Sequence, residues 1–346
     1  MKTKLFYLLP LSLLIACGGS EEKVEKKEEV KVEPGIELSA LQKQAKSLFR
    51  ELPEIAENSE NPTTKEKVAL GKKLYFETQL SKDNKISCNS CHNIENGTGV
   101  DNLPVSPGND AGTFGGRNSP TTLNAALHIA QFWDGRAKDV EEQAGGPILN
   151  PVEMAMPSEE AVVERLSGIE EYPALFAAAF PEEEKPITYL NLQKAIGAFE
   201  RTLITPSKLD DFIAGNESAL NDQERKGLET FVSVGCVSCH LGNAIGGNMY
   251  QKFGVYGDYW EYTKSKKIDE GKFEVSNNEA DKYIFKVPTL RNVEKTAPYF
   301  HDGSVEKLED AVNIMAKAQL NKELTPEETN DIVAFLKALS GDVSYE

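Results

Sequence analysis

Long hydrophobic runs, histidine and positive charge are all scarce in this chain of 346 residues. Beyond its first residues, no segment approaches the 18 or so consecutive apolar residues that cross a bilayer, which excludes a multi-span membrane protein. Lysine and arginine number 38 against 55 acidic residues, and the resulting net charge of −17 repels nucleic acid. No alternating apolar run is long enough to predict a large sheet. The remaining composition, 40% hydrophobic, is that of a globular chain long enough for two domains.

The only strongly apolar stretch lies at the start, where Lys2 and Lys4 precede residues 5–15. This length is typical of a signal-peptide core and is too short for a membrane span. The stretch ends in Leu-Ile-Ala-Cys17, which resembles the lipobox of bacterial lipoproteins. We therefore expect a signal peptide over residues 1–16, a lipid on Cys17 and a charged, solvated tether over 17–36. An ordinary signal peptide with an incidental cysteine, and a short charged helix in place of the tether, are the alternatives.

The other four cysteines form one pattern twice, Cys-x-x-Cys-His, at residues 88–92 and 236–240. This is the haem c attachment motif: two thiols add to the vinyl groups of one porphyrin, and the adjacent imidazole reaches the iron. A single all-thiolate zinc site would leave both histidines unexplained, and redox disulfides of the Cys-x-x-Cys type occur in a βαβ context that is lacking here. The predicted haem-binding residues are Cys88, Cys91, His92, Cys236, Cys239 and His240.

A helical pattern with an apolar face precedes each motif, at residues 66–76 and 222–231. This repetition predicts two tandem cytochrome-c-like haem domains with the boundaries 37–205 and 206–346, and long glycine-rich loops are expected around the cofactors. Apolar residues from Leu308 to Met315 also recur at helical spacing. A last helix is expected to open with a Thr325–Glu328 capping box and to stop at Gly341. The predicted fold class is mainly α.

Six further segments carry a more specific resemblance, in order along the chain. They read RNSPTTLNA (117–125), QFWDGR (131–136), EQA (142–144), NPVEM (150–154), FKVPTLRN (285–292) and TAPYFHDG (296–303). Together with the two haem motifs, they are similar to the bacterial dihaem cytochrome c peroxidase family from about residue 40 to the end. In that family the first haem reacts with peroxide and the second receives electrons.

The resemblance implies that His92 is the proximal ligand of the first haem and His240 that of the second. The second haem of the family takes a methionine as its sixth ligand, which corresponds to Met315 here. A methionine and a histidine together raise the potential and keep peroxide off the iron, which suits a relay. Met249 is the main competitor for this position, and a methionine on an apolar helix face is otherwise a core residue.

By the same resemblance, Glu153 and Gln143 belong to the distal pocket of the first haem. Glu153 would move a proton between the two peroxide oxygens, and Gln143 would orient the substrate by hydrogen bonding. Trp133 would be the bridging aromatic residue between the haems, although a buried tryptophan is also an ordinary core residue.

The family binds one calcium ion through an asparagine side chain and loop carbonyls, which implies Asn118, Thr296 and Pro298 as ligands here. Of the two remaining histidines, His301 is expected to hydrogen-bond near the domain interface. His128, expected on a helix leading to Trp133, is interpreted as a core histidine whose hydrogen bonds are satisfied.

One loop departs from the family pattern. Many members carry a histidine shortly before the segment that starts at Arg117, and it caps the first iron until the enzyme is reduced. Residues 106–116 read SPGNDAGTFGG and contain no histidine. We therefore expect the first haem to be reactive as isolated, with His128 as the alternative cap.

The resemblance implies a periplasmic or cell-envelope enzyme that reduces hydrogen peroxide with electrons from a small cytochrome c or a copper protein (cupredoxin). A homodimer and a lipid-mediated membrane attachment are expected as well. Two other functions remain open: an oxidase resembling the methylamine-dehydrogenase maturation enzyme, in which tyrosine replaces the ligating methionine, and a non-enzymatic dihaem electron carrier.

Overall fold

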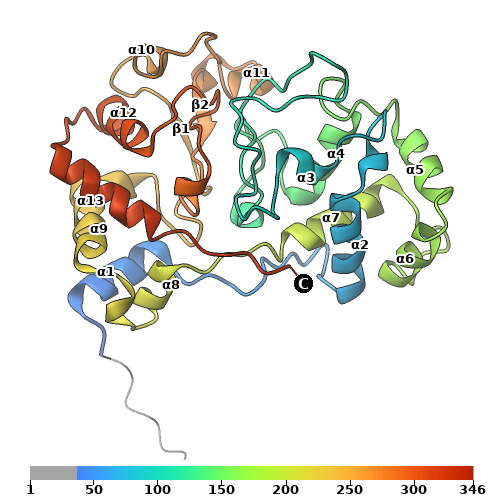
Figure 1. The fold of residues 1–346 in the computed structure, drawn as a ribbon, viewed down its shortest axis with the longest axis horizontal. Coiled ribbons are helices and arrows are strands. Elements are labelled where there is room, and N and C mark those ends of the chain that lie inside the picture. The colour runs from blue at the N-terminus through green and yellow to red at the C-terminus, as the bar shows by residue number, and fades with distance from the viewer. Residues whose placement is uncertain (1–36, 346) are drawn as a thin grey trace, which may run out of the picture. The chain divides into compact units, whose positions relative to one another are not determined.

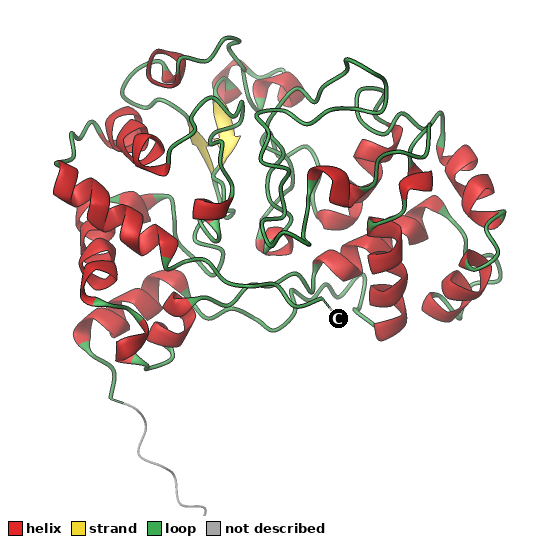
Figure 2. Cartoon of the chain, in the orientation of Figure 1, coloured by secondary structure: helices red, strands yellow, loops and turns green. Residues whose placement is uncertain are grey.

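The computed structural model describes residues 37–345, and most of their regular structure is helical (Figures 1 and 2). The mainly α class is confirmed. The helices are α1 (Ala40–Phe49), α2 (Lys65–Tyr75), α3 (Cys88–Cys91), α4 (Val140–Leu149), α5 (Glu159–Ser167), α6 (Tyr172–Ala179), α7 (Tyr189–Glu200), α8 (Lys208–Ile213), α9 (Asp222–Val234), α10 (Tyr259–Thr263), α11 (Phe273–Ser276), α12 (Leu308–Leu320) and α13 (Pro326–Lys337). The signal peptide, Cys17 and tether predicted for 1–36 lie outside the described residues.

The described residues contain one small sheet, in which β1 (Tyr250–Lys252) pairs with β2 (Ile284–Lys286) in antiparallel register. Tyr250 lies opposite Lys286, so the loop after the second haem motif is joined to the FKVPTLRN segment. Within residues 37–345, no helix combines the length and apolar character that a membrane crossing needs.

The helices expected before the two haem motifs are present as α2 and α9, and the apolar repeat from Leu308 is α12. Helix α13 opens with the expected capping box: the Thr325 side chain accepts from the Glu328 amide, and Glu328 reaches back to Thr325. Its end was predicted too late. The helix stops at Lys337 because the chain then turns to pair Gly341 N with the Asn292 side chain, 2.9 Å away.

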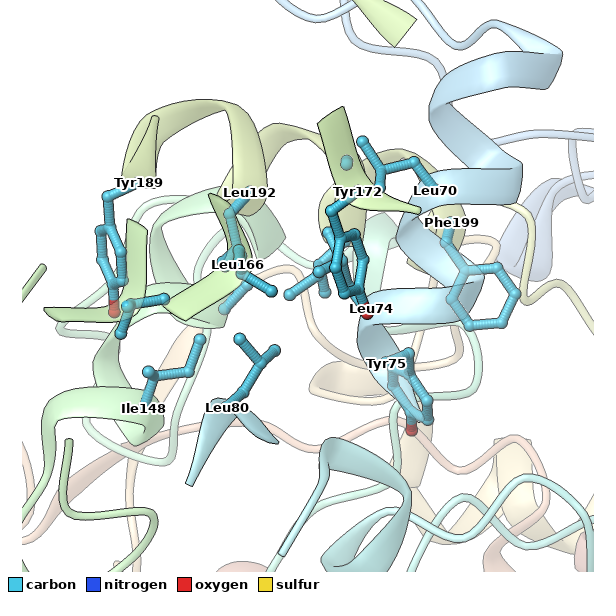
Figure 3. Close-up of a cluster of buried hydrophobic side chains, with 14 of the residues drawn as sticks. Leu70, Leu74, Tyr75, Leu80, Ile148, Leu166, Tyr172, Tyr189, Leu192 and Phe199 are labelled. Atoms are coloured by element: carbon cyan, nitrogen blue, oxygen red, sulfur yellow. The ribbon is translucent and has the colours of Figure 1, made fainter. Parts of the chain in front are cut away.

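Two separate clusters of buried apolar side chains form the core. The first is built by α2, α4, α5, α6 and α7, with Leu74 and Leu192 among its fully buried members (Figure 3). The second is built mainly by α8, α9, α12 and α13. Each end of the described chain packs with the cluster of the opposite half. Phe49 of α1 belongs to the second cluster, and Tyr345 packs against the first.

A pair of crossing helices stands at the centre of each cluster, and the two pairs are built alike. α2 crosses α7 at Gly71, where an added Cβ would lie 1.9 Å from the Ala195 carbonyl oxygen. α9 crosses α13 at Gly227, where the corresponding distance to the Asp331 carbonyl oxygen is also 1.9 Å. Only glycine permits so close an approach of two backbones.

The residue four positions after each glycine is aromatic and meets a phenylalanine of the opposite helix. Tyr75 lies 5.4 Å from Phe199 between ring centroids, and Phe231 lies 5.3 Å from Phe335. This shared construction supports two domains of one type. The boundary between residues 205 and 206 remains a prediction.

Candidate functional site

The first Cys-x-x-Cys-His motif opens onto a cavity of about 460 Å³. Cys88 and Cys91 begin and end the short helix α3, and both thiols line this cavity. Neither is in a disulfide, and burial raises the pKa of both, so they are neutral thiols. The two cysteines are therefore available for thioether formation.

His92 follows directly and is held by its backbone and by its ring. Its amide donates to the Cys88 carbonyl, and its Nδ1 lies 3.0 Å from the Pro120 carbonyl oxygen. A carbonyl only accepts, so Nδ1 carries the hydrogen and Nε2 keeps its lone pair. Burial lowers the His92 pKa, which also favours the neutral ring. A neutral imidazole with Nδ1–H bonded to a backbone carbonyl is the arrangement of a metal ligand, so the motif fits a haem iron.

The same cavity receives the two predicted distal residues. Gln143 lies on α4, and Glu153 lies in the turn that follows this helix. The Asn150 amide donates to one Glu153 carboxylate oxygen at 3.0 Å. Burial raises the Glu153 pKa against the opposing effect of Arg136, so this carboxyl keeps a proton at higher pH than an exposed glutamate does.

The second motif opens onto a different, mostly apolar cavity of about 230 Å³. Cys236, Cys239 and His240 line it, and burial lowers the His240 pKa to about 4, so the ring is neutral. Met315 of α12 lines the same cavity, whereas Met249 does not. The residues present therefore fit a second haem with a histidine and a methionine available on the iron.

The two cysteine pairs thus serve two cavities and do not converge. Among residues 37–345, no group of three or more histidine, cysteine, aspartate or glutamate side chains is placed to hold a metal ion. The arrangement does not fit the all-thiolate zinc site considered for this sequence.

Trp133 lines both cavities. Its indole Nε1 donates to the Asn118 carbonyl at 2.9 Å, and its carbonyl accepts from the Lys286 amide at 2.8 Å. The ring is therefore fixed between the two motifs by contacts from both halves of the chain.

The three predicted calcium ligands, Asn118, Thr296 and Pro298, all line the second cavity. The Asn118 side-chain nitrogen donates to the Leu103 carbonyl at 2.8 Å, which leaves its side-chain oxygen free to accept or to ligate. The calcium site remains a prediction.

His128 is not on a helix, contrary to the sequence-based expectation. Only a single 3₁₀ turn (Ala125–Leu127) precedes it, because Asn124 adopts a left-handed conformation and binds Thr205 through its side chain. His128 Nδ1 lies 3.0 Å from the Lys286 amine, and its buried Nε2 has no hydrogen-bond partner, so its hydrogen bonding is only half satisfied. It lines the second cavity and is not among the residues that line the first.

His301 is almost fully buried beside the second cavity, within an aromatic cage. Its ring centroid lies 4.5 Å from that of Phe285 and 6.2 Å from that of Trp133. Its backbone carbonyl accepts from the Asn118 amide at 2.7 Å, but its Nε2 has no hydrogen-bond partner. The expected hydrogen bonding of this residue is therefore made by its backbone.

The loop that lacks histidine is tied to the turn that carries Glu153. The Asn109 amide donates to the Glu153 carbonyl at 2.7 Å, and the Asn109 side chain accepts from the Asp83 amide at 3.1 Å. Lys82 pairs with Asp110 at 3.1 Å. These contacts hold the loop beside the first cavity through short side chains and backbone groups.

Two charged features of the first cavity were missed by the sequence analysis. Arg117 bridges Asp134, Asp269 and Glu274, and thereby joins a segment of the second half to the cavity wall. Glu200, at the end of α7, is a buried carboxyl that lines the cavity. A glutamate on an otherwise apolar helix face was the only signal that could have revealed Glu200.

The chain is similar to known proteins over most of its length. A profile described as di-haem cytochrome c peroxidase matches residues 65–218. The cytochrome c551 peroxidase of Pseudomonas aeruginosa is 45% identical over 310 residues, which cover 89% of this chain and 88% of that protein. The methylamine utilization protein MauG of Methylorubrum extorquens is 34% identical, over 86% of this chain and 84% of that protein.

A solved structure of a MauG-like protein associated with microbial copper homeostasis has a TM-score of 0.74 and 28% identity. The match covers 85% of this chain and 94% of that one. The likeness in sequence and structure extends over most of the chain. This protein is a peroxidase that belongs to the di-haem cytochrome c peroxidase family.

Proposed function

We propose that this protein reduces hydrogen peroxide to water in the first cavity, with electrons that arrive one at a time through the second. The observation that carries the proposal is the division of side chains between the cavities. His92, Gln143 and Glu153 meet in the first, whereas His240 and Met315 meet in the second. Trp133 lines both and provides the contact between them.

In the first cavity, bound haem supplies an iron with an open position and exchanges electrons. His92 binds on one side, held in its tautomer by the Pro120 carbonyl. Glu153 takes the proton from one oxygen of peroxide and gives it to the other, which leaves as water as the O–O bond breaks. Two electrons from the donor and two protons convert the remaining oxygen into the second water. Gln143 orients the substrate through its amide. The raised Glu153 pKa suits a group that must both accept and donate a proton near neutral pH.

In the second cavity, His240 and Met315 would hold the haem iron, which would supply electron transfer, and with both ligands provided by the protein this site would not bind peroxide. The donor is a small cytochrome c or a cupredoxin, which matches a protein of strongly negative charge with a basic or dipolar partner surface. Met315 also argues against a maturation enzyme of the methylamine-dehydrogenase type, which resembles this chain less closely. The acid–base groups of the first cavity argue against a simple electron carrier.

Three further features belong to the same proposal. The mature protein is placed in the periplasm or cell envelope and anchored by a lipid on Cys17. A calcium ion is held near Asn118, Thr296 and Pro298, and two copies form a homodimer. Mass spectrometry of membrane-extracted protein is expected to show two haems and the lipid on one chain, and an unlipidated mature form in the native host would contradict the anchor.

The central test is steady-state peroxide turnover with a reduced small cytochrome c. Saturable consumption of the reduced donor, two per peroxide, is the expected result. Absence of turnover with either a cytochrome or a cupredoxin donor, in a protein that carries both haems, would overturn the proposal.

A further inference from the structure

Glu200 is the last residue of α7, and its side chain reaches the first cavity while only 3% of the residue is exposed. The hydrogen bonds of the adjacent Arg201 guanidinium go to the Glu141 carboxylate and not to Glu200. A buried carboxyl is costly to ionise unless a cation or a hydrogen-bond donor pairs with it.

The nearby cation is already engaged elsewhere. The Arg201 guanidinium donates two hydrogen bonds to Glu141, at 2.8 and 2.6 Å, and a third to the Ala56 carbonyl at 2.9 Å. Glu141 therefore neutralises Arg201, and its own negative charge faces Glu200. Tyr75 of α2 and Cys88 of α3 are the other titratable groups that face this carboxyl, and neither carries positive charge.

Burial, followed by the charge of Glu141, raises the pKa of Glu200 to about 8, and Arg201 opposes this only in part. The carboxyl therefore keeps its proton to a much higher pH than an exposed glutamate does. A change of one charge inside the same cavity would then shift its protonation, because two interacting sites titrate together.

The second cavity has an apolar side chain at the position equivalent to Glu200. Phe199 meets Gly71 in one helix pair as Phe335 meets Gly227 in the other, each with its Cβ 2.9 Å from the Cβ position of the glycine. Glu200 therefore corresponds to Leu336, and Leu336 lines the second cavity. The fold itself accepts leucine at this position, so packing does not explain the carboxyl of the first cavity.

We propose that Glu200 is a proton-loading residue of the first cavity: its carboxylate binds one proton as an electron reaches this cavity and releases that proton as the electron passes to peroxide. The inference rests on the proposed function. One electron and one proton leave the net charge of the buried cavity unchanged. In the overall reaction the O–O bond breaks, and two electrons from the donor and two protons convert one peroxide into two waters.

The first test is a redox titration of the holoenzyme at several pH values on either side of pH 8. The midpoint potential of the haem at His92 is expected to fall as the pH rises, because deprotonated Glu200 disfavours the added electron. In Glu200→Gln and in Glu200→Leu, which copies the second cavity, the Glu200 contribution to this dependence is lost. Glu164→Gln, an exposed change on α5, is the matched control and is expected to titrate like the wild type.

Glu153 also has a raised pKa and faces the same cavity, so its own variant separates the two carboxyls. Glu153→Gln is expected to retain the part of the pH dependence that the Glu200 variants lose. The same dependence in wild type and in both Glu200 variants would overturn the proposal.

The second test is a reduced-minus-oxidised infrared difference spectrum of the wild-type holoenzyme, recorded above pH 8 so that most of Glu200 is ionised before reduction. A protonated carboxyl band that shifts in heavy water is expected to appear on reduction, and it is expected to vanish in Glu200→Gln. Absence of any such band in the wild type overturns the proposal even if neither Glu200 variant folds. Neither test uses peroxide. A negative result therefore contradicts proton loading at Glu200, whereas failure of the proposed peroxidase function would appear only in the turnover assay.

Discussion

The two haem motifs are built on matching helix pairs, yet the cavity of the first motif has a more polar lining than the cavity of the second. Tyr75 and Glu200 of the first pair correspond to Phe231 and Leu336 of the second. The first cavity also contains Glu153 and Gln143, whereas the second is closed by apolar side chains and Met315. One backbone arrangement thus carries two differently lined cavities, to which the proposed function assigns proton chemistry and electron transfer, and the difference lies in a few side chains.

This comparison explains why burial has different consequences in the two cavities. In an apolar cavity, burial keeps the His240 ring neutral and restricts the site to ligands that the protein itself provides. In the first cavity, burial raises the pKa of Glu153 and of Glu200, so each carboxyl keeps its proton to a higher pH than an exposed glutamate does. Under the proposed function, the same physical effect would suit the second site to electron relay and the first to acid–base catalysis.

Among substitutions in the first cavity, Glu153→Gln is expected to have the largest effect on the rate of peroxide reduction. Removal of this acid–base group is expected to slow peroxide reduction by roughly 10²–10⁴-fold, the usual contribution of such a group, while the haem spectra change little. Glu142→Gln, exposed and on α4 itself, is the control. Unaltered turnover would place the proton transfer on another residue.

The pH profile of the wild type tests the same carboxyl. Glu153 must be ionised to accept the first proton, so kcat/KM is expected to fall as the pH drops through its raised pKa. This acid limb should lie above the usual glutamate range of about 4.3. It should disappear in Glu153→Gln, and an unchanged limb in that variant would assign it to a different group.

The second cavity is tested by Met315→Leu. Haem attachment should persist, but the ferric sulfur-to-iron band expected near roughly 700 nm should be lost, and turnover driven by the donor should fall. Met249→Leu is the matched control, because Met249 does not line this cavity. A band that survives Met315→Leu would show that another residue ligates the iron.

The two cores can be compared by Leu74→Ala in the first and Leu228→Ala in the second. Both side chains are fully buried, so each change is expected to lower the free energy of unfolding by about 2–5 kcal/mol. Denaturant unfolding followed at each haem should give one shared transition, because α1 and the C-terminal tail connect the cores. Two separate transitions would show that the halves are independent.

The smallest effect on the rate of reaction with peroxide is expected from reducing the enzyme before the assay. The loop at residues 106–116 offers no imidazole to the first iron, and its carboxyl, amide and hydroxyl oxygens are poor ligands by comparison. Stopped-flow mixing with peroxide should therefore give similar rates with and without pre-reduction. A low-spin ferric signal from two histidines, together with a strict need for reduction, would implicate His128.

Much of the site could be predicted because the residues that bind haem lie in short, contiguous sequence motifs. Two thiols and an imidazole within five residues reach one porphyrin wherever the chain places them. Glu153 and Gln143 were assigned through a family resemblance, and the structure places both in the cavity of His92. Their catalytic roles, like the ligand role of Met315, remain predictions that the experiments above address.

The errors arose where tertiary contacts override local preference. The segment before His128 has a helical composition, but the bond between Asn124 and Thr205 holds it in a turn, 81 residues away in sequence. Helix α13 ends early because Gly341 is drawn to Asn292. Neither partner can be recognised from the residues next to it, since long-range contacts depend on the completed fold.

The sequence by itself determined the covalent haem motifs and the helices that precede them, because each depends on residues close together along the chain. Only the tertiary structure decided that these helices cross their partners at Gly71 and Gly227, that Trp133 lines both cavities and that Glu200 is buried beside an arginine already paired with Glu141. Burial and the engagement of Arg201 by Glu141 are properties of neighbours that are distant in sequence. The carboxyl has its raised pKa only when those neighbours are in place.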